Sequence, residues 1–253
     1  MTLILLALAA AAAPAGPVDS PDRRYRACLA AVRAAPATAE GQAKAWLSSG
    51  GGIMAAQCLG LAYSAQERWP EAGAAFEAAA RDAAARDDRR CGDLWVQAGN
   101  AWLAAGDAAQ ARTALEAALT TKQLAPQLEG EVHLDLARVA VARNDLTLAR
   151  AEIDKGLKLV PDDAFGWYIS AALARRTNDL PRAQEHIAKA VALAPDDAAI
   201  LLEAGNIAGV SGEQDAAQGL YARAMRAGPD TDAGRAAKAA LEAAPAAKAP
   251  QPR

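Results

Sequence analysis

The sequence predicts an all-α protein built from repeated helical hairpins, and three observations support this prediction. Hydrophobic residues make up 53% of the 253 residues but aromatic residues only 4%, and alanine supplies most of the remainder. Alanine is the best helix former and a poor strand former. Prolines recur every 34 residues, and apolar side chains recur at helical spacing between them. A β-sheet protein is therefore disfavoured, and a wholly disordered chain is excluded.

The first segment, residues 1–15, is predicted to be a signal peptide. Leu3 to Ala13 is an uninterrupted apolar run that is too short to span a bilayer comfortably, and small residues follow it. Because no Lys or Arg precedes the run, the alternative is an ordinary N-terminal helix packed on the fold. A signal peptide implies a periplasmic or secreted protein with no integral membrane segment after cleavage.

Export makes a disulfide possible among the cysteines, which are Cys28, Cys58 and Cys91. Three pairings exist, and each leaves one thiol over. Cys28–Cys58 is the predicted pair, because both residues lie in the irregular N-terminal part of the chain, where a covalent link is most useful. The alternative is that all the cysteines are small buried hydrophobic residues.

Residues 16–52 are predicted to form an N-terminal helical cap. Ser20 followed by Pro21 is typical of a helix start, and this predicts a helix that reaches about Ala34. A second helix is expected over about 38–48, before consecutive glycines interrupt the chain.

A repeat of 34 residues occupies most of the remaining chain. Pro161, Pro195 and Pro229 follow this spacing, and each precedes an aspartate. The same spacing separates pairs of a turn-forming and an acidic residue: Asn144-Asp145, Asn178-Asp179 and Gly212-Glu213. Proline ends one helix, and an acidic residue caps the next one. Each unit is therefore predicted to be a helix, a short turn, a second helix and another short turn.

Within the units, the apolar pattern indicates paired helices that cross closely. Trp95, Ala98, Gly99 and Trp102 have the spacing of one helical face. These tryptophans, together with Trp167, are therefore predicted to be core residues. Small residues are expected to let the helix axes approach closely, and large residues beside them fill the remaining space. The small residues are Gly99, Ala111, Ala183, Gly205 and Ala217.

These features resemble the tetratricopeptide repeat family. Its 34-residue unit carries Trp, Leu-Gly and Tyr on the first helix, then Ala, a large apolar residue, Ala and Pro. Leu59-Gly60, Tyr63 and Phe76 match this pattern in the first unit. The resemblance implies a right-handed superhelical solenoid of tetratricopeptide-type hairpins over residues 53–231.

The expected repeats are 53–86, 92–125, 130–163, 164–197 and 198–231. Short insertions at 87–91 and 126–129 are expected to separate the early repeats. Residues 232–244 are expected to form a C-terminal capping helix that shields the last apolar face, and 245–253 a flexible tail.

No motif predicts catalysis, and the protein is expected not to be an enzyme and to bind no cofactor or metal. Gly50–Gly52 lacks the Lys and Ser/Thr of a phosphate-binding loop. His133 and His186 are far apart and have no partners at ligand spacing. His133 is expected to be a structural residue on a core face, and His186 to face solvent. The net charge of −3, without a basic block, predicts no nucleic-acid binding.

The resemblance implies a non-enzymatic scaffold that binds a peptide or protein segment in a concave groove lined by the first helices. The candidate partner-binding residues are Asn100, Arg138, Phe165, Tyr168, Arg175, Arg176 and Asn206. The two asparagines stand where related repeats hold a ligand backbone. Arginine and aromatic residues are frequent interface anchors. The lysines that complete a carboxylate clamp in some relatives are absent.

Two alternatives stay open at this point. In the first, Phe165 and Tyr168 fill gaps between neighbouring units and the nearby arginines are simply solvated. In the second, the protein is a structural subunit of an envelope assembly or a chaperone-like factor, and it uses its convex face or its tail.

Overall fold

The computed structural model describes residues 20–243, which contain 13 α-helices and no β-strand. The predicted leader at 1–15 and the predicted tail at 245–253 lie outside this range. In chain order the helices are α1 (Pro21–Ala34), α2 (Pro36–Ser48), α3 (Gly52–Ser64), α4 (Trp69–Ala85), α5 (Cys91–Ala104), α6 (Ala108–Thr120), α7 (Pro126–Ala142), α8 (Leu146–Leu159), α9 (Ala164–Arg176), α10 (Leu180–Leu193), α11 (Ala198–Val210), α12 (Gln214–Ala227) and α13 (Asp232–Ala243).

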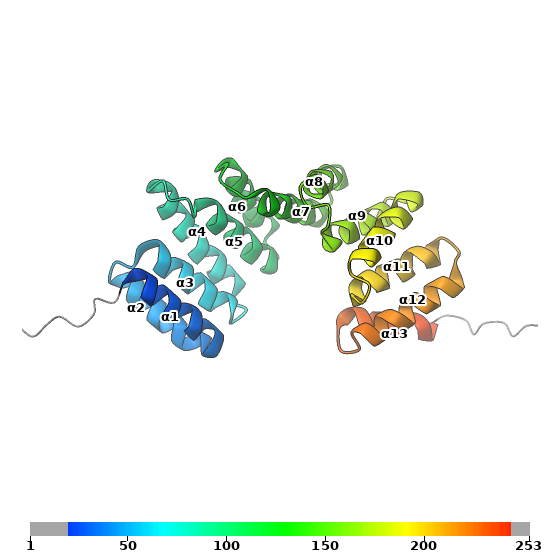
Figure 1. The fold of residues 1–253 in the computed structure, drawn as a ribbon, viewed down its shortest axis with the longest axis horizontal. Helices are drawn as coiled ribbons and strands as arrows, with labels where there is room; N and C mark the ends of the chain where they lie inside the picture. The colour runs from blue at the N-terminus through cyan, green and yellow to red at the C-terminus, as the bar shows by residue number, and fades with distance from the viewer. Residues whose placement is uncertain (1–19, 244–253) are drawn as a thin grey trace, which may run out of the picture.

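The helices pack in consecutive pairs, and successive pairs stack into an arch (Figure 1). The ends of the arch are formed by α1–α3 and α11–α13, and its crown by α6–α8. In this view α5 and α7 lie toward the inside of the arch, and α6 and α8 toward the outside. The predicted all-α solenoid is confirmed. Within residues 20–243, none of the helices combines the length and the apolar character that a membrane span requires.

Aspartates are the N-cap residues of several helices, at the positions that the repeat pattern predicts. Asp145 Oδ1 accepts a hydrogen bond from the backbone N–H of Leu148 at 3.0 Å, and Asp163 Oδ1 accepts one from Gly166 at 2.7 Å. Asp107, Asp179 and Asp197 cap their helices in the same way. Glu213 does not, in agreement with the preference for Asp over Glu at this position.

The turn inside each repeat contains one residue with positive φ at the same place in the unit. These residues are Glu67 (57°), Gly106 (76°), Asn144 (59°), Asn178 (60°) and Gly212 (85°). Glycine and asparagine adopt this left-handed conformation more readily than other residues do. The repeated Asn-Asp and Gly-Glu pairs therefore mark a turn whose first residue needs this conformation and whose second residue precedes the next helix.

Two segments differ from the sequence prediction. Helix α2 begins at Pro36 rather than at about residue 38, because the fixed φ of proline suits the first helical turn. Residues 126–129 were expected to be an insertion between repeats, but they form the first turn of α7. Pro126 at the start and Glu129 in the first turn both favour this extension.

Glycines lie where the two helices of a hairpin cross. A Cβ atom built on Gly99 would lie 2.6 Å from Leu115 Cδ2, and one on Gly205 would lie 2.5 Å from Tyr221 Cε1. Real Cβ atoms essentially never approach other atoms so closely. The predicted pairing of a small residue with a large neighbour is therefore confirmed at these crossings.

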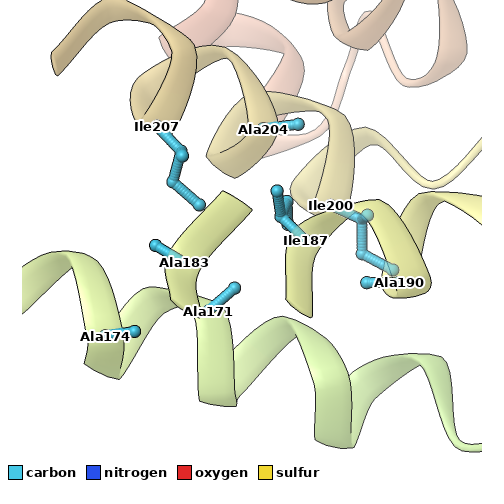
Figure 2. Close-up of a cluster of buried hydrophobic side chains, with 8 residues drawn as sticks. All are labelled: Ala171, Ala174, Ala183, Ile187, Ala190, Ile200, Ala204 and Ile207. Atoms are coloured by element: carbon cyan, nitrogen blue, oxygen red, sulfur yellow. The ribbon is translucent and has the colours of Figure 1, made fainter. Parts of the chain in front are cut away.

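Alanines and larger aliphatic residues fill the core between successive hairpins. Figure 2 shows one such cluster, in which residues of α9, α10 and α11 meet. Its members are Ala171, Ala174, Ala183, Ile187, Ala190, Ile200, Ala204 and Ile207. The abundance of alanine thus reflects narrow helix crossings, into which a few larger aliphatic side chains insert.

Trp95, Trp102 and Trp167 pack against the buried clusters, as predicted for core residues, but each of them is only partly buried. The indole N–H of a tryptophan needs a partner, and this favours the edge of a core. Trp102 Nε1 donates to Glu77 Oε1 at 2.8 Å, and Trp167 Nε1 donates to the carbonyl oxygen of Pro161 at 2.7 Å.

His186 was expected to face solvent, but it is buried. Its Nδ1 lies 2.8 Å from Ser170 Oγ, and its ring meets the ring of Trp167 edge-on. These contacts show that α10 turns this residue toward α9. His133 has the expected structural position, with Nδ1 2.6 Å from Oε2 of the buried Glu152.

A disulfide joins Cys28 of α1 to Cys58 of α3, with a Cα–Cα distance of 6.1 Å. Of the residues in α1, Cys28 alone is buried. The disulfide therefore links this polar helix covalently to the first repeat, and Tyr25 and Val32 of α1 pack against the same cluster. Cys91 is a free, buried thiol whose Sγ lies 3.6 Å from the carbonyl oxygen of Ala80.

Candidate partner-binding site

A pocket of about 410 Å³ lies between α7 and α9, and Ile153 of α8 contributes to its lining. We call it the α7–α9 pocket. Its apolar lining consists of Ala137, Val141, Ile153, Ile169, Ala172 and Leu173, and its other lining residues are Arg138, Tyr168, Arg175 and Arg176. Four of the seven candidate partner-binding residues therefore meet here. The volume falls within the range of about 300–1,000 Å³ that is usual for ligand pockets.

Small side chains on the facing helices provide this space. Ala137 of α7 and Ala172 of α9 present only a methyl group to the pocket. Ala137, Ile153 and Leu173 also belong to the buried cluster between α7, α8 and α9. The pocket therefore opens directly onto the hydrophobic core, so an apolar group that enters it is removed from water on several sides.

Aromatic rings and an arginine connect α7 to α9 beside the pocket. Phe165 lies outside the lining and is 44% exposed. The Arg138 guanidinium lies 5.8 Å from the centre of the Phe165 ring, which is itself 6.0 Å from the Tyr168 ring. Arg138 Nη1 also donates to Asp135 Oδ1 at 2.8 Å. Burial raises the pKa of Asp135, and the nearby Arg138 opposes this effect.

Arg175 is paired within the protein. It donates from Nε to Glu203 Oε1 at 2.6 Å and from Nη2 to Glu203 Oε2 at 3.1 Å. These bonds raise the pKa of Arg175. Asn206 Nδ2 donates to the same carboxylate at 3.2 Å, and Tyr221 donates its hydroxyl hydrogen to Asn206 Oδ1 at 3.1 Å. Both polar atoms of the Asn206 side chain thus have partners inside the fold.

Arg176 differs from Arg175 in its surroundings. Its side chain is exposed, and Nη2 donates to Asn144 Oδ1, a neutral acceptor, at 2.8 Å. Among the described residues, no carboxylate forms an ion pair with it. Asn100 is exposed on α5 and is not part of the pocket lining. The structure therefore separates Asn100 from the arginine and aromatic residues.

A second large pocket, of about 540 Å³, is lined by residues of α10, α11 and α12 and by Glu213, the residue before α12. We call it the α10–α12 pocket. Ala188, Ile207 and Glu213 are among its lining residues, and none of the candidate partner-binding residues lies there. Within residues 20–243, no cluster of three or more His, Cys, Asp or Glu side chains is arranged to hold a metal ion.

The hairpin solenoid with its 34-residue unit has the fold of the tetratricopeptide-repeat proteins. No protein-family model and no curated protein sequence matches the chain. Solved structures do match it. PilF of Pseudomonas aeruginosa aligns with a TM-score of 0.69 at 17% identity, over 87% of this chain and 97% of that chain.

Two further structures are similar. PilW, described as a widely conserved type IV pilus biogenesis factor, aligns with a TM-score of 0.67 at 17% identity, over 85% of this chain and 97% of that one. YrrB is described as a tetratricopeptide-repeat protein with an unusual peptide-binding site. It aligns with a TM-score of 0.53 at 18% identity, over 78% of this chain and 96% of that chain. At these identities the similarity establishes the fold.

Proposed function

We propose that the protein is a non-enzymatic scaffold that binds a peptide segment of a partner protein on its concave face, at the α7–α9 pocket. The observation that carries this proposal is an aliphatic cavity, open to the core, beside several arginines and two aromatic rings. Arginine and aromatic residues around a pocket that excludes water are the usual anchors of protein interfaces.

The architecture and the similar structures support this role. Stacked helical hairpins create an extended concave surface without needing any catalytic group. A peptide-binding site is described for YrrB and a role in pilus biogenesis for PilW. We further propose a periplasmic or secreted location, because the Cys28–Cys58 disulfide suits an oxidising compartment and the apolar run at 3–13 suits a leader.

A selection from a random peptide library tests the binding site. The disulfide-bonded protein is compared with Ala172→Trp, which fills the α7–α9 pocket, and with Ala188→Trp, which introduces the same side chain into the α10–α12 pocket. Circular dichroism establishes that each variant is folded. We expect peptides that bind the wild type and Ala188→Trp but not Ala172→Trp. Peptides that bind all three proteins equally would contradict the proposed site.

An alternative role as a structural subunit that uses its convex face has one observation in its favour. Leu159 of α8 and Leu193 of α10 occupy equivalent positions of successive repeats and are 38% and 42% exposed. A partner that docks there would bind the wild type, Ala172→Trp and Ala188→Trp equally, and would lose affinity on the double substitution Leu159→Ser and Leu193→Ser.

A further inference from the structure

We infer that the α7–α9 pocket selects a peptide segment in which an apolar side chain is flanked by acidic ones. This inference rests on the proposed function, and it specifies the chemistry of the partner. It follows from three properties of the pocket: the composition of its lining, the pairing of its arginines and the low polarity of its base.

The charged residues in the pocket lining are all positive. The lining contains three arginines and no aspartate or glutamate. The α10–α12 pocket shows the opposite, because Glu213 lines it and no Lys or Arg does. These two pockets therefore differ in the sign of their charged lining residues, and the lining of the α7–α9 pocket is positive.

The three arginines are not equally compensated. Arg175 is matched by the buried carboxylate of Glu203, and Arg138 shares its charge with Asp135. Arg176 has a hydrogen bond to the neutral Asn144 amide and forms no ion pair with a carboxylate of residues 20–243. A peptide carboxylate at the rim would therefore gain a partner at Arg176, whereas a peptide ammonium group would face a net repulsion.

The apolar base makes this preference stronger. Ile153 and Leu173 are 1% and 3% exposed, so the floor of the pocket is part of the hydrophobic core. An apolar side chain that fills this space displaces water from the rim. Ion pairs in such surroundings are screened less than pairs in bulk water, and an arginine can hold a carboxylate by two parallel hydrogen bonds.

Three synthetic twelve-residue peptides, labelled with fluorescein, test the inference. The first has a central Leu flanked by Glu in a Gly-Ser background. The second replaces the Glu residues by Lys, and the third replaces the Leu by Ser. Fluorescence anisotropy at low and moderate salt gives the affinities for the disulfide-bonded protein. We expect the Leu-Glu peptide to bind on the order of tenfold more tightly than either of the others.

Two charge reversals locate the effect. Arg176→Glu is expected to abolish or invert the preference for Glu over Lys. Arg226→Glu makes the same change on the exposed surface of α12, away from the pocket, and is expected to leave the preference unchanged. Equal effects of both variants would show that only the net charge of the protein matters, and would overturn the inference.

The two proposals fail in different ways. If library peptides depend on Ala172 but show no enrichment of acidic residues, the pocket binds peptides and the inferred chemistry is wrong. The same conclusion holds if the Leu-Glu peptide binds no better than the Leu-Lys peptide. If no peptide is sensitive to Ala172→Trp, the proposed site fails, and the inference fails with it.

Discussion

Arg175 of α9 and Glu203 of α11 form a two-point ion pair between successive repeats, with N–O distances of 2.6 and 3.1 Å. Glu203 is buried, whereas Arg175 also lines the α7–α9 pocket. The same side chain therefore shapes the pocket and joins two repeats. A charge reversal at Arg175 would place two carboxylates together, so Arg176 is the better position for testing partner binding.

Replacement of Glu203 by Gln should weaken the contact between these repeats. The variant keeps the shape of the side chain but leaves Arg175 without its counter-charge, and we expect the free energy of unfolding to fall by about 1–3 kcal/mol. Urea denaturation measures this change. Glu185→Gln is the control, because the Glu185–Lys189 pair is largely exposed, and we expect this substitution to leave the free energy of unfolding almost unchanged. Equal costs for the two variants would argue against a structural role for the Arg175–Glu203 pair.

Gly205→Ala should destabilise the fifth repeat, because the new Cβ would lie 2.5 Å from Tyr221 Cε1. We expect a loss of about 1–3 kcal/mol. Gly219→Ala is the matched control in a helix where the new Cβ meets no atom within 4 Å. There, the better helix propensity of alanine should stabilise the protein by about 0.5–1 kcal/mol. Thermal denaturation should move the two melting temperatures in opposite directions, and a shift in the same direction would contradict the crossing geometry.

His186 should make stability depend on pH. Burial lowers its pKa from the usual 6.5, and the nearby Arg182, Lys189 and Arg150 act in the same direction, against Glu185. The folded state therefore favours the neutral ring, and the unfolded chain binds the proton more readily. Stability is full above about pH 6.5 and falls as the pH decreases toward the lower pKa of the folded protein.

His186→Gln isolates this contribution from that of other groups. Between about pH 7.5 and pH 5, the free energy of unfolding of the wild type should fall more steeply than that of the variant, by up to about 1.4 kcal/mol per pH unit. Chemical denaturation at several pH values measures both curves. Parallel curves would show that His186 titrates alike in the folded and unfolded states.

Reduction of the Cys28–Cys58 disulfide should release α1. The bond closes a loop with a sequence separation of 30, and its loss is expected to cost about 3–4 kcal/mol. Because Cys28 is the one buried residue of α1, trypsin should then cleave rapidly at the arginines of this helix, such as Arg23 and Arg26. The oxidised and reduced proteins are compared with Cys91→Ser in place, because this substitution removes the free thiol. Unchanged cleavage after reduction would show that packing alone holds α1.

The repeated parts of the fold could be predicted because each unit carries the same local chemistry. Asn144 and Asn178 occupy equivalent left-handed turn positions, and the aspartates after them cap the following helices. Such local signals depend little on distant residues. The first turn of α7 was missed, because residues 126–129 lie outside the 34-residue pattern and their helical character comes from Pro126 and Glu129 instead.

The site could be predicted only in part. Arg138, Tyr168 and Arg176 were recognisable as residues that suit an interface, and the structure brings them together. The roles of Arg175 and Asn206 depend on Glu203, a contact between repeats that no local pattern reveals. Helix rotation decides which side chains are buried, and an error of a fraction of a turn explains the wrong placement of His186.

Methyl NMR shows directly whether the α7–α9 pocket holds a peptide. The protein is labelled at its isoleucine methyl groups and titrated with a peptide from the library selection. We expect the signals of Ile153 and Ile169, which line this pocket, to shift with a common saturation curve, while those of Ile187 and Ile207 in the α10–α12 pocket stay in place. Shifts confined to Ile187 and Ile207, with Ile153 and Ile169 unchanged, would show that the peptide binds elsewhere and not in the α7–α9 pocket.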